Sequence, residues 1–255
     1  MYIPSEGGSS KGRACLQMTY TSHLLRGNEN RPSYVGLNDD DTALIKTLGF
    51  TPKSYPAETV IVSQGEDNDR LFIVESGWGC ISHELAGGQR QILDFALSGD
   101  VVLPQAYAGS ALETFVAQTE LSVLVASTKT FTLAAMKSPH LFSLIIETVV
   151  HRGALVAQHL TNIGRRSALA RASHLFLELR ARLERVGAVT RDSYECPLTQ
   201  YDLADALGLT PLHVNRVLRN LRERRLLEFR QGHVRVLDQA GLAKLAGFEP
   251  GYIES

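Results

Sequence analysis

Between residues 59 and 125, apolar and polar residues alternate in short runs that turn-forming residues interrupt. The runs cover residues 59–62, 71–75, 79–82, 91–95, 114–117 and 121–125. Ser76-Gly77, Gly87-Gly88 and Ser98-Gly99-Asp100 are among the turns between them. Short strands at this spacing, without long helices between them, predict an antiparallel jelly roll. A short helix over 42–48, capped by the acidic run at 39–41, is expected just before it.

The pattern changes after Ser138-Pro139, which predicts the start of a long helix. Seven positions then recur at alternating steps of three and four residues: Phe142, Ile145, Val149, Arg152, Val156, His159 and Ile163. This spacing is typical of a helix that packs against a partner helix, although two of the seven residues are polar. We therefore interpret residues 138–165 as a dimerisation helix. The alternative is a helix that packs only on its own domain.

Two capped helices joined by a glycine turn are predicted near the C-terminus. Thr199 can cap the first helix, with Asp202 as its capping-box partner, and Gly208 supplies the left-handed turn residue. Thr210 caps the second helix, and Pro211 stands at its first position, where a missing N–H costs nothing. The second helix has an inward apolar stripe of Val214, Val217, Leu218 and Leu221. Together these features predict a helix-turn-helix.

A β-hairpin over 226–237, with its turn at Gln231-Gly232, follows the second helix in the position of a wing. The expected fold class is therefore α+β, in three folded parts. They are an antiparallel β jelly-roll sensor domain (37–137), the dimerisation helix (138–165) and a C-terminal winged helix-turn-helix domain (166–255). Residues 1–36 are interpreted as a mobile tail; a cap packed on the next domain is the alternative.

Charge is informative only when it is examined locally. The 255-residue chain has a formal net charge of −1. Fourteen of its 26 basic residues, all of them Arg, lie between Arg165 and Arg235, among only eight acidic residues. That stretch is therefore +6 and the rest of the chain is −7. A basic region of this kind indicates a polyanionic partner.

The second helix of the turn concentrates this charge. His213, Asn215 and Arg216 lie in its first turns, where a recognition helix presents side chains to base edges. Arg pairs with guanine and Asn with adenine, so we expect base contacts from these three residues. Phosphate contacts are expected from the residues around them: Thr199, Thr210, Arg219, Arg222, Arg225 and His233. A solvated basic helix without a ligand is the alternative.

Other classes of protein require residues that are lacking here. No apolar run approaches the roughly 18 residues of a membrane span, and the N-terminus lacks a secretory signal, so we expect no membrane partner. The three cysteines, Cys15, Cys80 and Cys196, form no CxxC pair, which favours a reduced, cytoplasmic compartment. A cupin-like metal enzyme would need several ligands on adjacent strands. The strand region contains only His83 as a candidate ligand, with Glu84 on the opposite face. We therefore expect that the protein is not an enzyme.

The order of jelly roll, pairing helix and winged helix-turn-helix resembles the Crp–Fnr family of bacterial transcription regulators, named after the cyclic-AMP receptor protein and the fumarate-nitrate-reductase regulator. The resemblance covers roughly residues 40–250. It is strongest from Pro197 to Arg222, and moderate at Gly65-Glu66, at 71–77 and at 97–100. It implies a homodimer that binds a two-fold symmetric operator on double-stranded DNA. It further implies that the regulator recruits or blocks RNA polymerase when a signal reaches the jelly roll.

Several residues depart from the family pattern. Cyclic-nucleotide binders of the family hold the phosphate with an Arg-Ser pair, whereas this chain has no arginine between Arg90 and Arg152. We therefore expect no cyclic AMP and predict no cofactor, and the effector is unknown. A predicted effector pocket comprises Gly99, Asp100, Val102 and Gln105. Three cysteines are too few for an iron–sulfur cluster, while a haem- or metabolite-sensing member of the family remains an alternative.

The recognition helix departs as well. Many members place a Glu that reads cytosine near the start of this helix, where this chain has Pro211 and Leu212. Arg216 matches the family's guanine-reading arginine, and we expect His213 and Asn215 to replace the missing Glu. The operator therefore cannot be copied from better-known members of the family.

Overall fold

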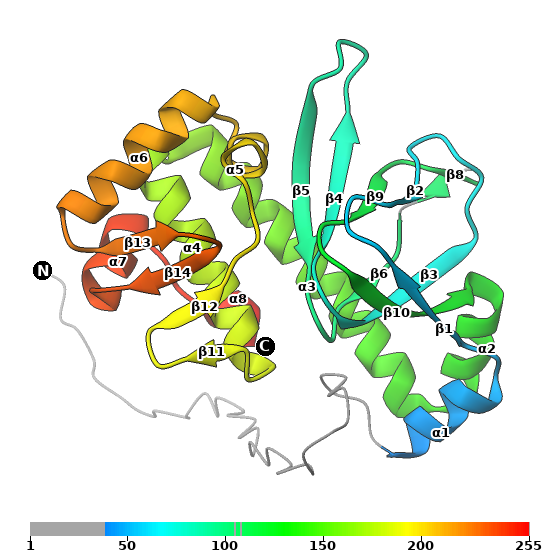
Figure 1. Ribbon diagram of the computed structural model, residues 1–255. Helices are drawn as coiled ribbons and strands as arrows, with labels where there is room; N and C mark the ends of the chain where they lie inside the picture. Colours follow the sequence, from blue (N-terminus) through cyan, green and yellow to red (C-terminus); the bar gives the residue numbers. More distant parts are fainter. Residues whose placement is uncertain (1–38, 105, 108, 255) are drawn as a thin grey trace, which may run out of the picture. The chain divides into compact units, whose positions relative to one another are not determined.

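The computed structural model describes residues 39–104, 106–107 and 109–254, and the predicted tail at 1–36 lies outside them. Helix α1 (Asp39–Thr47) comes first; it overlaps the helix expected over 42–48 but includes the acidic run at 39–41 that was expected to cap it. The strands that follow form two four-stranded antiparallel sheets and a small two-stranded one (Figure 1). Their bounds are β1 Thr51–Tyr55, β2 Val60–Val62, β3 Arg70–Ser76, β4 Gly79–Glu84, β5 Arg90–Ala96, β6 Val101–Val102, β7 Ala106–Tyr107, β8 Ser110–Ala111, β9 Thr114–Ala117 and β10 Leu121–Ser127.

The two larger sheets enclose the core of the jelly roll. One has the strand order β1-β10-β3-β6 and the other β2-β9-β4-β5. Phe72 from the first sheet and Phe115 from the second are fully buried, with ring centroids 5.3 Å apart. Alternation places every second side chain of a strand on the inner face, so the apolar runs of the sequence supply both walls of this core.

The six predicted strands are all present as β2, β3, β4, β5, β9 and β10. Four strands of this domain were not predicted (β1, β6, β7 and β8), and the longest of them is β1. Its residues, Thr51–Tyr55, are almost all exposed, so its sequence carries no apolar alternation. Strand β1 forms because it pairs with β10 over its whole length. The jelly roll ends in helix α2 (Thr128–Lys137), which was also not predicted as a separate helix.

The long predicted helix is α3 (Pro139–Arg165), 27 residues in length. The side chain of Ser138 accepts a hydrogen bond from the backbone N–H of Leu141, and Pro139 stands at the first position. This arrangement satisfies an orphan donor at the helix start and explains why the helix begins there. Helix α4 (Ala168–Arg185) follows after Ser167, which caps it in the same way.

The C-terminal part contains the predicted helix-turn-helix and wing. Helices α5 (Gln200–Leu207) and α6 (Pro211–Glu223) are joined through Gly208, whose φ of 62° is left-handed as expected. A four-stranded antiparallel sheet with the order β11-β12-β14-β13 packs with them, and α7 (Gln239–Ala246) and α8 (Gly251–Glu254) close the chain. Its strands are β11 Val189–Thr190, β12 Ser193–Glu195, β13 Leu227–Arg230 and β14 His233–Val236.

Burial of apolar side chains continues from the jelly roll into the C-terminal part. Trp78, Cys80 and Phe95, on and beside β4 and β5, belong to the same buried cluster as Phe176 of α4 and Leu203 of α5. Burial of these large side chains is worth roughly 1.5–3 kcal/mol each. The outer surface of the β4–β5 pair is therefore a platform for the helix-turn-helix.

Candidate nucleic-acid interface

Helix α6 has one buried and one exposed face. Val214, Val217 and Leu221 are at most 5% exposed and pack into the domain. The Thr210 hydroxyl accepts a hydrogen bond from the backbone N–H of His213, which caps the helix as predicted. Since this packing fixes the rotation of the helix about its axis, it also determines which side chains face outward.

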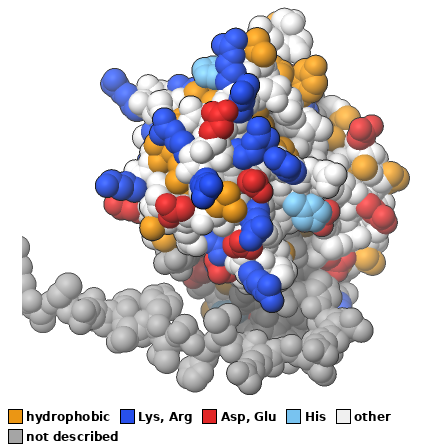
Figure 2. All heavy atoms as spheres, turned by 60° about the vertical axis from the view of Figure 1, so that its left-hand side comes forward, with side chains coloured by type: hydrophobic (Ala, Val, Ile, Leu, Met, Phe, Trp, Pro, Cys, Tyr) orange, Lys and Arg blue, Asp and Glu red, His pale blue; other side chains and the backbone are white. Residues whose placement is uncertain are grey.

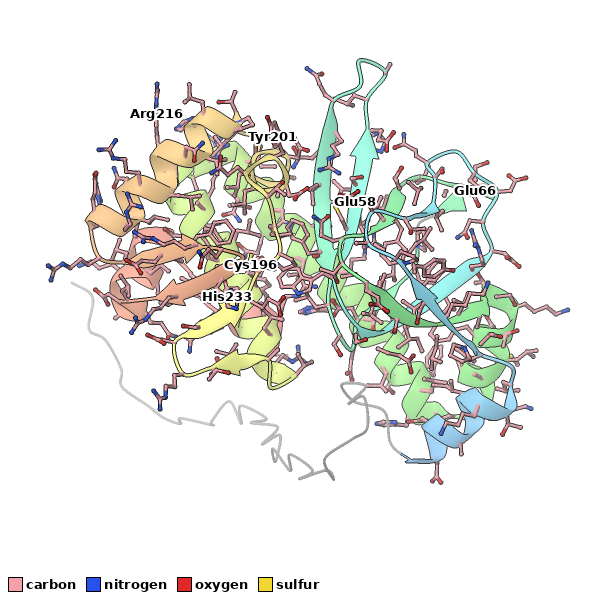
Figure 3. All side chains as sticks on the ribbon, viewed as in Figure 1. Glu58, Glu66, Cys196, Tyr201, Arg216 and His233 are labelled. Carbon is pink, nitrogen blue, oxygen red and sulfur yellow. The ribbon has the colours of Figure 1, made fainter. Side chains whose placement is uncertain are left out.

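The three predicted base-contacting residues all lie on the exposed face. His213, Asn215 and Arg216 are exposed, and Figure 3 shows Arg216 projecting outward from α6. Space-filling representation of this side of the molecule shows Lys and Arg side chains spread over the surface, with acidic side chains between them (Figure 2). A helix with this outward set has the donors and acceptors that base edges in the major groove require.

Asn215 has a partner that the sequence did not predict. Its Nδ2 donates to Oε1 of Gln200, at the start of α5, over 2.7 Å. The pair joins the two helices of the turn on their outer side and holds the Asn215 amide in one orientation. Polar residues at both helix starts were visible in the sequence, but their contact depends on the crossing of α5 and α6.

The predicted phosphate-contacting residues divide into two groups. Arg219, Arg222, Arg225 and His233 are exposed, and Arg219 forms an exposed ion pair with Glu223 at 2.9 Å. The Thr199 hydroxyl, in contrast, donates to the Asp202 carboxylate and accepts from the Asp202 backbone N–H. Thr199 is therefore engaged in capping α5, and Thr210 in capping α6. Both threonines therefore have the capping roles that were predicted, and their contact with phosphates stays a prediction.

Side chains of the jelly roll hold the start of α5. Arg90, the first residue of β5, donates through Nη2 to Oδ1 of Asp202 at 2.7 Å and through Nε to Oδ2 of Asp205 at 2.7 Å. Gln118 donates to the Asp202 carboxylate at 3.0 Å, and Gln91 donates to the backbone carbonyl of Ala206. The carboxylate that caps α5 is thus also its anchor on the jelly roll.

The exposed apolar face of α3 differs in part from the predicted pairing face. Phe142, Val149 and Val156 are 53%, 55% and 43% exposed, as a pairing face requires. Arg152 and His159 instead have partners in their own chain, and Ile163 is partly covered. Ile145 lies in α3, but the exposure of its side chain is not described. The other exposed positions of this face are Ile146, Gly153 and Leu160, each one residue after a predicted position (Ile145, Arg152 and His159).

The physical reason for this correction is the electrostatic environment of the two polar side chains. Arg152 donates to the buried Glu113 carboxylate at 2.5 Å and to the backbone carbonyl of Leu103 at 2.7 Å. The His159 ring contacts the carbonyl of Leu93 through Nδ1 and the Glu178 carboxylate through Nε2, both at 2.9 Å. These partners come from the jelly roll and α4, so this side of α3 faces its own chain.

His159 and Glu178 form the centre of a buried ionic network. Burial alone would lower the pKa of His159, but the Glu178 carboxylate outweighs it and raises that pKa to about 9. Burial would raise the pKa of Glu178, but His159 and Arg182 hold it below its usual value. Arg182 in turn donates to the carboxylates of Asp94 and Asp100, each at 2.8 Å. The network therefore joins α3 and α4 to β5 and to the turn after it.

The predicted effector-pocket residues are found in different environments. Gly99 occupies a turn with a φ of 90°, and Val102 is buried in the jelly-roll core. The Asp100 carboxylate accepts hydrogen bonds from Arg182 and from the backbone N–H of Leu97. Gln105 lies outside the described residues. Asp100 thus serves in the network with α4.

Two further findings concern metals and membranes. Among the described residues, no group of three or more His, Cys, Asp or Glu side chains could hold a metal ion. Within the same part of the chain, α3 alone is long and apolar enough to cross a membrane by length and composition, with a mean hydropathy of 1.3 over 18 residues. The sequence has no unbroken apolar run of that length, because Glu147, His151 and Arg152 interrupt this helix, whereas the mean hydropathy averages over them.

A jelly roll followed by a long exposed helix and a winged helix-turn-helix defines a DNA-binding regulator with an attached sensor-type domain. Comparison with known proteins supports this class separately for the jelly roll and for the helix-turn-helix domain. Residues 52–138 match the model of the cyclic nucleotide-binding domain, and residues 170–245 match that of the Crp-like helix-turn-helix domain. The chain belongs to the Crp–Fnr family of transcription regulators, as the sequence resemblance predicted.

The similarity to individual relatives covers most of this chain and most of each relative. The nitrogen fixation regulation protein FixK of Rhizobium meliloti (strain 1021) is 29% identical over 195 residues, which is 73% of this chain and 85% of that protein. The transcriptional activator protein FnrL of Cereibacter sphaeroides is 25% identical and covers 76% and 80%. The structure of FixK2 from Bradyrhizobium japonicum has the same fold, with a TM-score of 0.71 at 23% identity, over 79% of this chain and 99% of that one.

Proposed function

We propose that this regulator binds, as a homodimer, a two-fold symmetric DNA operator that α6 reads in the major groove. The observation that carries the proposal is the exposed face of α6, where His213, Asn215 and Arg216 face outward while Val214 and Val217 are buried. Arg222 and Arg225 lie farther along on the exposed surface and are suited to phosphates. RNA polymerase is the partner on which a regulator bound at such a site would act.

A second copy of the chain is the proposed occupant of the exposed face of α3. Phe142, Ile146, Val149, Gly153, Val156 and Leu160 recur at steps of four and three, the repeat with which helices pair. Leu160 is 72% exposed, and exposed apolar stripes of this length mark interaction sites. Members of the family act as dimers. Pairing through α3 would bring two copies of α6 to one duplex.

Substitution on and beside this face tests the dimer. Val156→Glu places a charge in the middle of the stripe, and Thr161→Glu places the same charge at an exposed position about 100° round the helix from Leu160. Light scattering should give twice the 28.0 kDa of one chain for the wild type and for Thr161→Glu. It should give the mass of one chain for Val156→Glu. A dimeric Val156→Glu variant, or a monomeric wild type, would contradict the proposal.

DNA binding is tested by selecting duplexes from a random library with the full chain. The proposal expects an enriched palindrome with half-sites centred about one helical turn apart. The affinity for that palindrome should fall steeply with salt, because each phosphate contact releases counterions. A selection that enriches no sequence would contradict the proposed function.

The sensor is proposed to act without cyclic AMP held in the usual manner. The chain has no arginine between Arg90 and Arg152, and the Arg152 guanidinium is already engaged by Glu113 and Leu103. A buried phosphate without a free cation would be badly unpaired. Thermal unfolding with and without millimolar cyclic AMP tests this, and the midpoint should stay unchanged. A rise of several degrees would contradict it.

A further inference from the structure

Leu212, the second residue of α6, is an apolar side chain on the exposed face of the helix. It is 63% exposed, whereas Val214, Val217 and Leu221 of the same helix are at most 5% exposed. Burial of a leucine side chain stabilises a folded protein by roughly 1.5–3 kcal/mol. An exposed Leu212 forgoes most of this stabilisation in the free protein. The position therefore departs from the division of α6 into an apolar inner and a polar outer face.

Leu212 shares its side of the helix with Arg216. Side chains four residues apart lie one above the other on a helix, so Leu212 and Arg216 are surface neighbours one turn apart. Arg216 is the residue that the resemblance to the family assigns to a guanine, and the proposed function places it in the major groove. Any docking that brings the Arg216 guanidinium to a base edge also brings Leu212 into the same groove, close to an adjacent base pair.

The other surface neighbour of Leu212, three residues along, is Asn215. The Gln200 side chain holds the Asn215 amide nitrogen at 2.7 Å, so this polar group is tied across the turn to α5. Leu212, His213 and Arg216 are exposed at the start of α6 and have no such tether among the contacts of the described residues, and of these three only Leu212 is apolar. Arg219, one turn further along, is held by Glu223 at 2.9 Å.

The chemistry of the major groove restricts what Leu212 can recognise. Guanine, cytosine and adenine present donors and acceptors there, and a leucine placed over them would leave those groups unpaired. Thymine presents one apolar group, the C5 methyl, which is the natural contact for an aliphatic side chain. We propose that Leu212 is a specificity-determining residue that selects thymine through its methyl group, next to the guanine contacted by Arg216. This proposal rests on the proposed function.

The first experiment repeats the library selection with the full-length wild type, Leu212→Ala, Leu212→Glu and Arg216→Ala. The wild-type palindrome should hold a thymine close to the guanine whose preference disappears in Arg216→Ala. Leu212→Ala should flatten the thymine preference and leave the guanine preference intact. Leu212→Glu should move the preference toward cytosine, because a carboxylate accepts a hydrogen bond from the cytosine N4 amine.

The second experiment removes the methyl group from the DNA instead of the leucine from the protein. Deoxyuridine replaces the selected thymine in each half-site, which changes nothing else on the base edge. Affinity of the wild type should fall about fourfold per half-site, the equivalent of about 0.8 kcal/mol for one buried methyl-sized group. Affinity of Leu212→Ala should not change with this replacement. Leu237→Ala, a matched control at a 39% exposed leucine outside α6, should respond to deoxyuridine as the wild type does.

The outcomes distinguish this proposal from the proposed function. Enrichment of a palindrome in which Leu212→Ala keeps the thymine preference would overturn the role of Leu212 and leave the DNA-binding function standing. Equal wild-type affinity for thymine and deoxyuridine would do the same. Failure of the wild type to enrich any sequence would overturn both. Loss of the deoxyuridine effect in Leu212→Ala alone would establish the contact.

Discussion

Arg90 and Asp202 form an ion pair of 2.7 Å between the first residue of β5 and the capping-box partner of Thr199 in α5. The Asp202 carboxylate also accepts hydrogen bonds from the Thr199 backbone N–H and hydroxyl. One buried carboxylate thus satisfies a backbone donor at the start of the helix-turn-helix and attaches that helix to the jelly roll. The orientation of α5, and of α6 packed on it, is therefore coupled to β5.

Removal of the Arg90 side chain should destabilise the protein measurably. Arg90→Ala should lower the free energy of unfolding in urea by about 1 kcal/mol, because the Arg90 side chain is 33% exposed and solvent weakens its two ion pairs. Asp202→Ala should cost about 2 kcal/mol, since it also removes the capping box of α5.

The matched control for Arg90 is an exposed ion pair of the same type. Arg235 and Asp192 are 2.9 Å apart, with side chains 59% and 43% exposed. Arg235→Ala should leave the free energy of unfolding essentially unchanged, because solvent screens an ion pair as exposed as this one. An equal effect of Arg90→Ala and Arg235→Ala would show that the contact between β5 and α5 contributes nothing specific.

Stability should fall at alkaline pH because of His159. The Glu178 carboxylate raises the pKa of His159 to about 9 in the folded chain, from 6.5 in the unfolded one. The folded state therefore retains a proton that the unfolded state loses, and this stabilisation is complete below pH 6.5 and lost as the pH rises through 9. The free energy of unfolding should drop by about 3 kcal/mol between pH 6 and pH 10, since one pKa unit is worth about 1.4 kcal/mol, and His159→Gln should remove most of that drop.

An opposite effect is expected in acid. Burial lowers the pKa of His174 to about 4 in the folded chain, from 6.5 in the unfolded one. Between pH 6.5 and 4 the unfolded state therefore binds a proton that the folded state does not bind. Stability should therefore decrease as the pH falls through this interval, and His174→Gln should flatten this acid limb while leaving the alkaline one. A single variant that altered both limbs equally would contradict the assignment of the two histidines.

Cys80 and Cys196 should be inert thiols in the folded protein. Both are buried, and burial raises the pKa of each to about 12, so neither forms the reactive thiolate near neutral pH. Peptide mass spectrometry after alkylation at pH 8 should find these two cysteines modified only when urea is present. Rapid modification of either one in the native state would contradict the buried placement.

Local sequence rules were sufficient for the elements of the helix-turn-helix. The capping box of Thr199 and Asp202, the left-handed Gly208, and Thr210 with Pro211 each use contacts within a few residues, so their spacing reveals them. The same holds for the wing, where Gln231 and Gly232 both have positive φ. Strand β1 was missed because it is specified by pairing with β10.

The orientation of α3 depended on contacts that a sequence pattern does not contain. Ile145 and Ile146 are both apolar, so a step of three and a step of four after Phe142 fit the sequence equally well. Glu113 and Glu178 decide between them by engaging Arg152 and His159 from distant parts of the chain. For the same reason the Gln200–Asn215 pair and the exposure of Leu212 became apparent only in the folded chain.

The central claim is that α6 reads bases through Arg216, and fluorescence anisotropy with the full chain tests it most directly. The titration compares the selected palindrome with a scrambled duplex of equal length, for the wild type, Arg216→Ala and Arg222→Ala. The wild type should prefer the palindrome by about 10³-fold or more. Arg216→Ala should lose about 1–3 kcal/mol on the palindrome and little on the scrambled duplex, whereas Arg222→Ala should weaken both alike. Equal losses on both duplexes in Arg216→Ala, or equal wild-type affinity for them, would contradict the account.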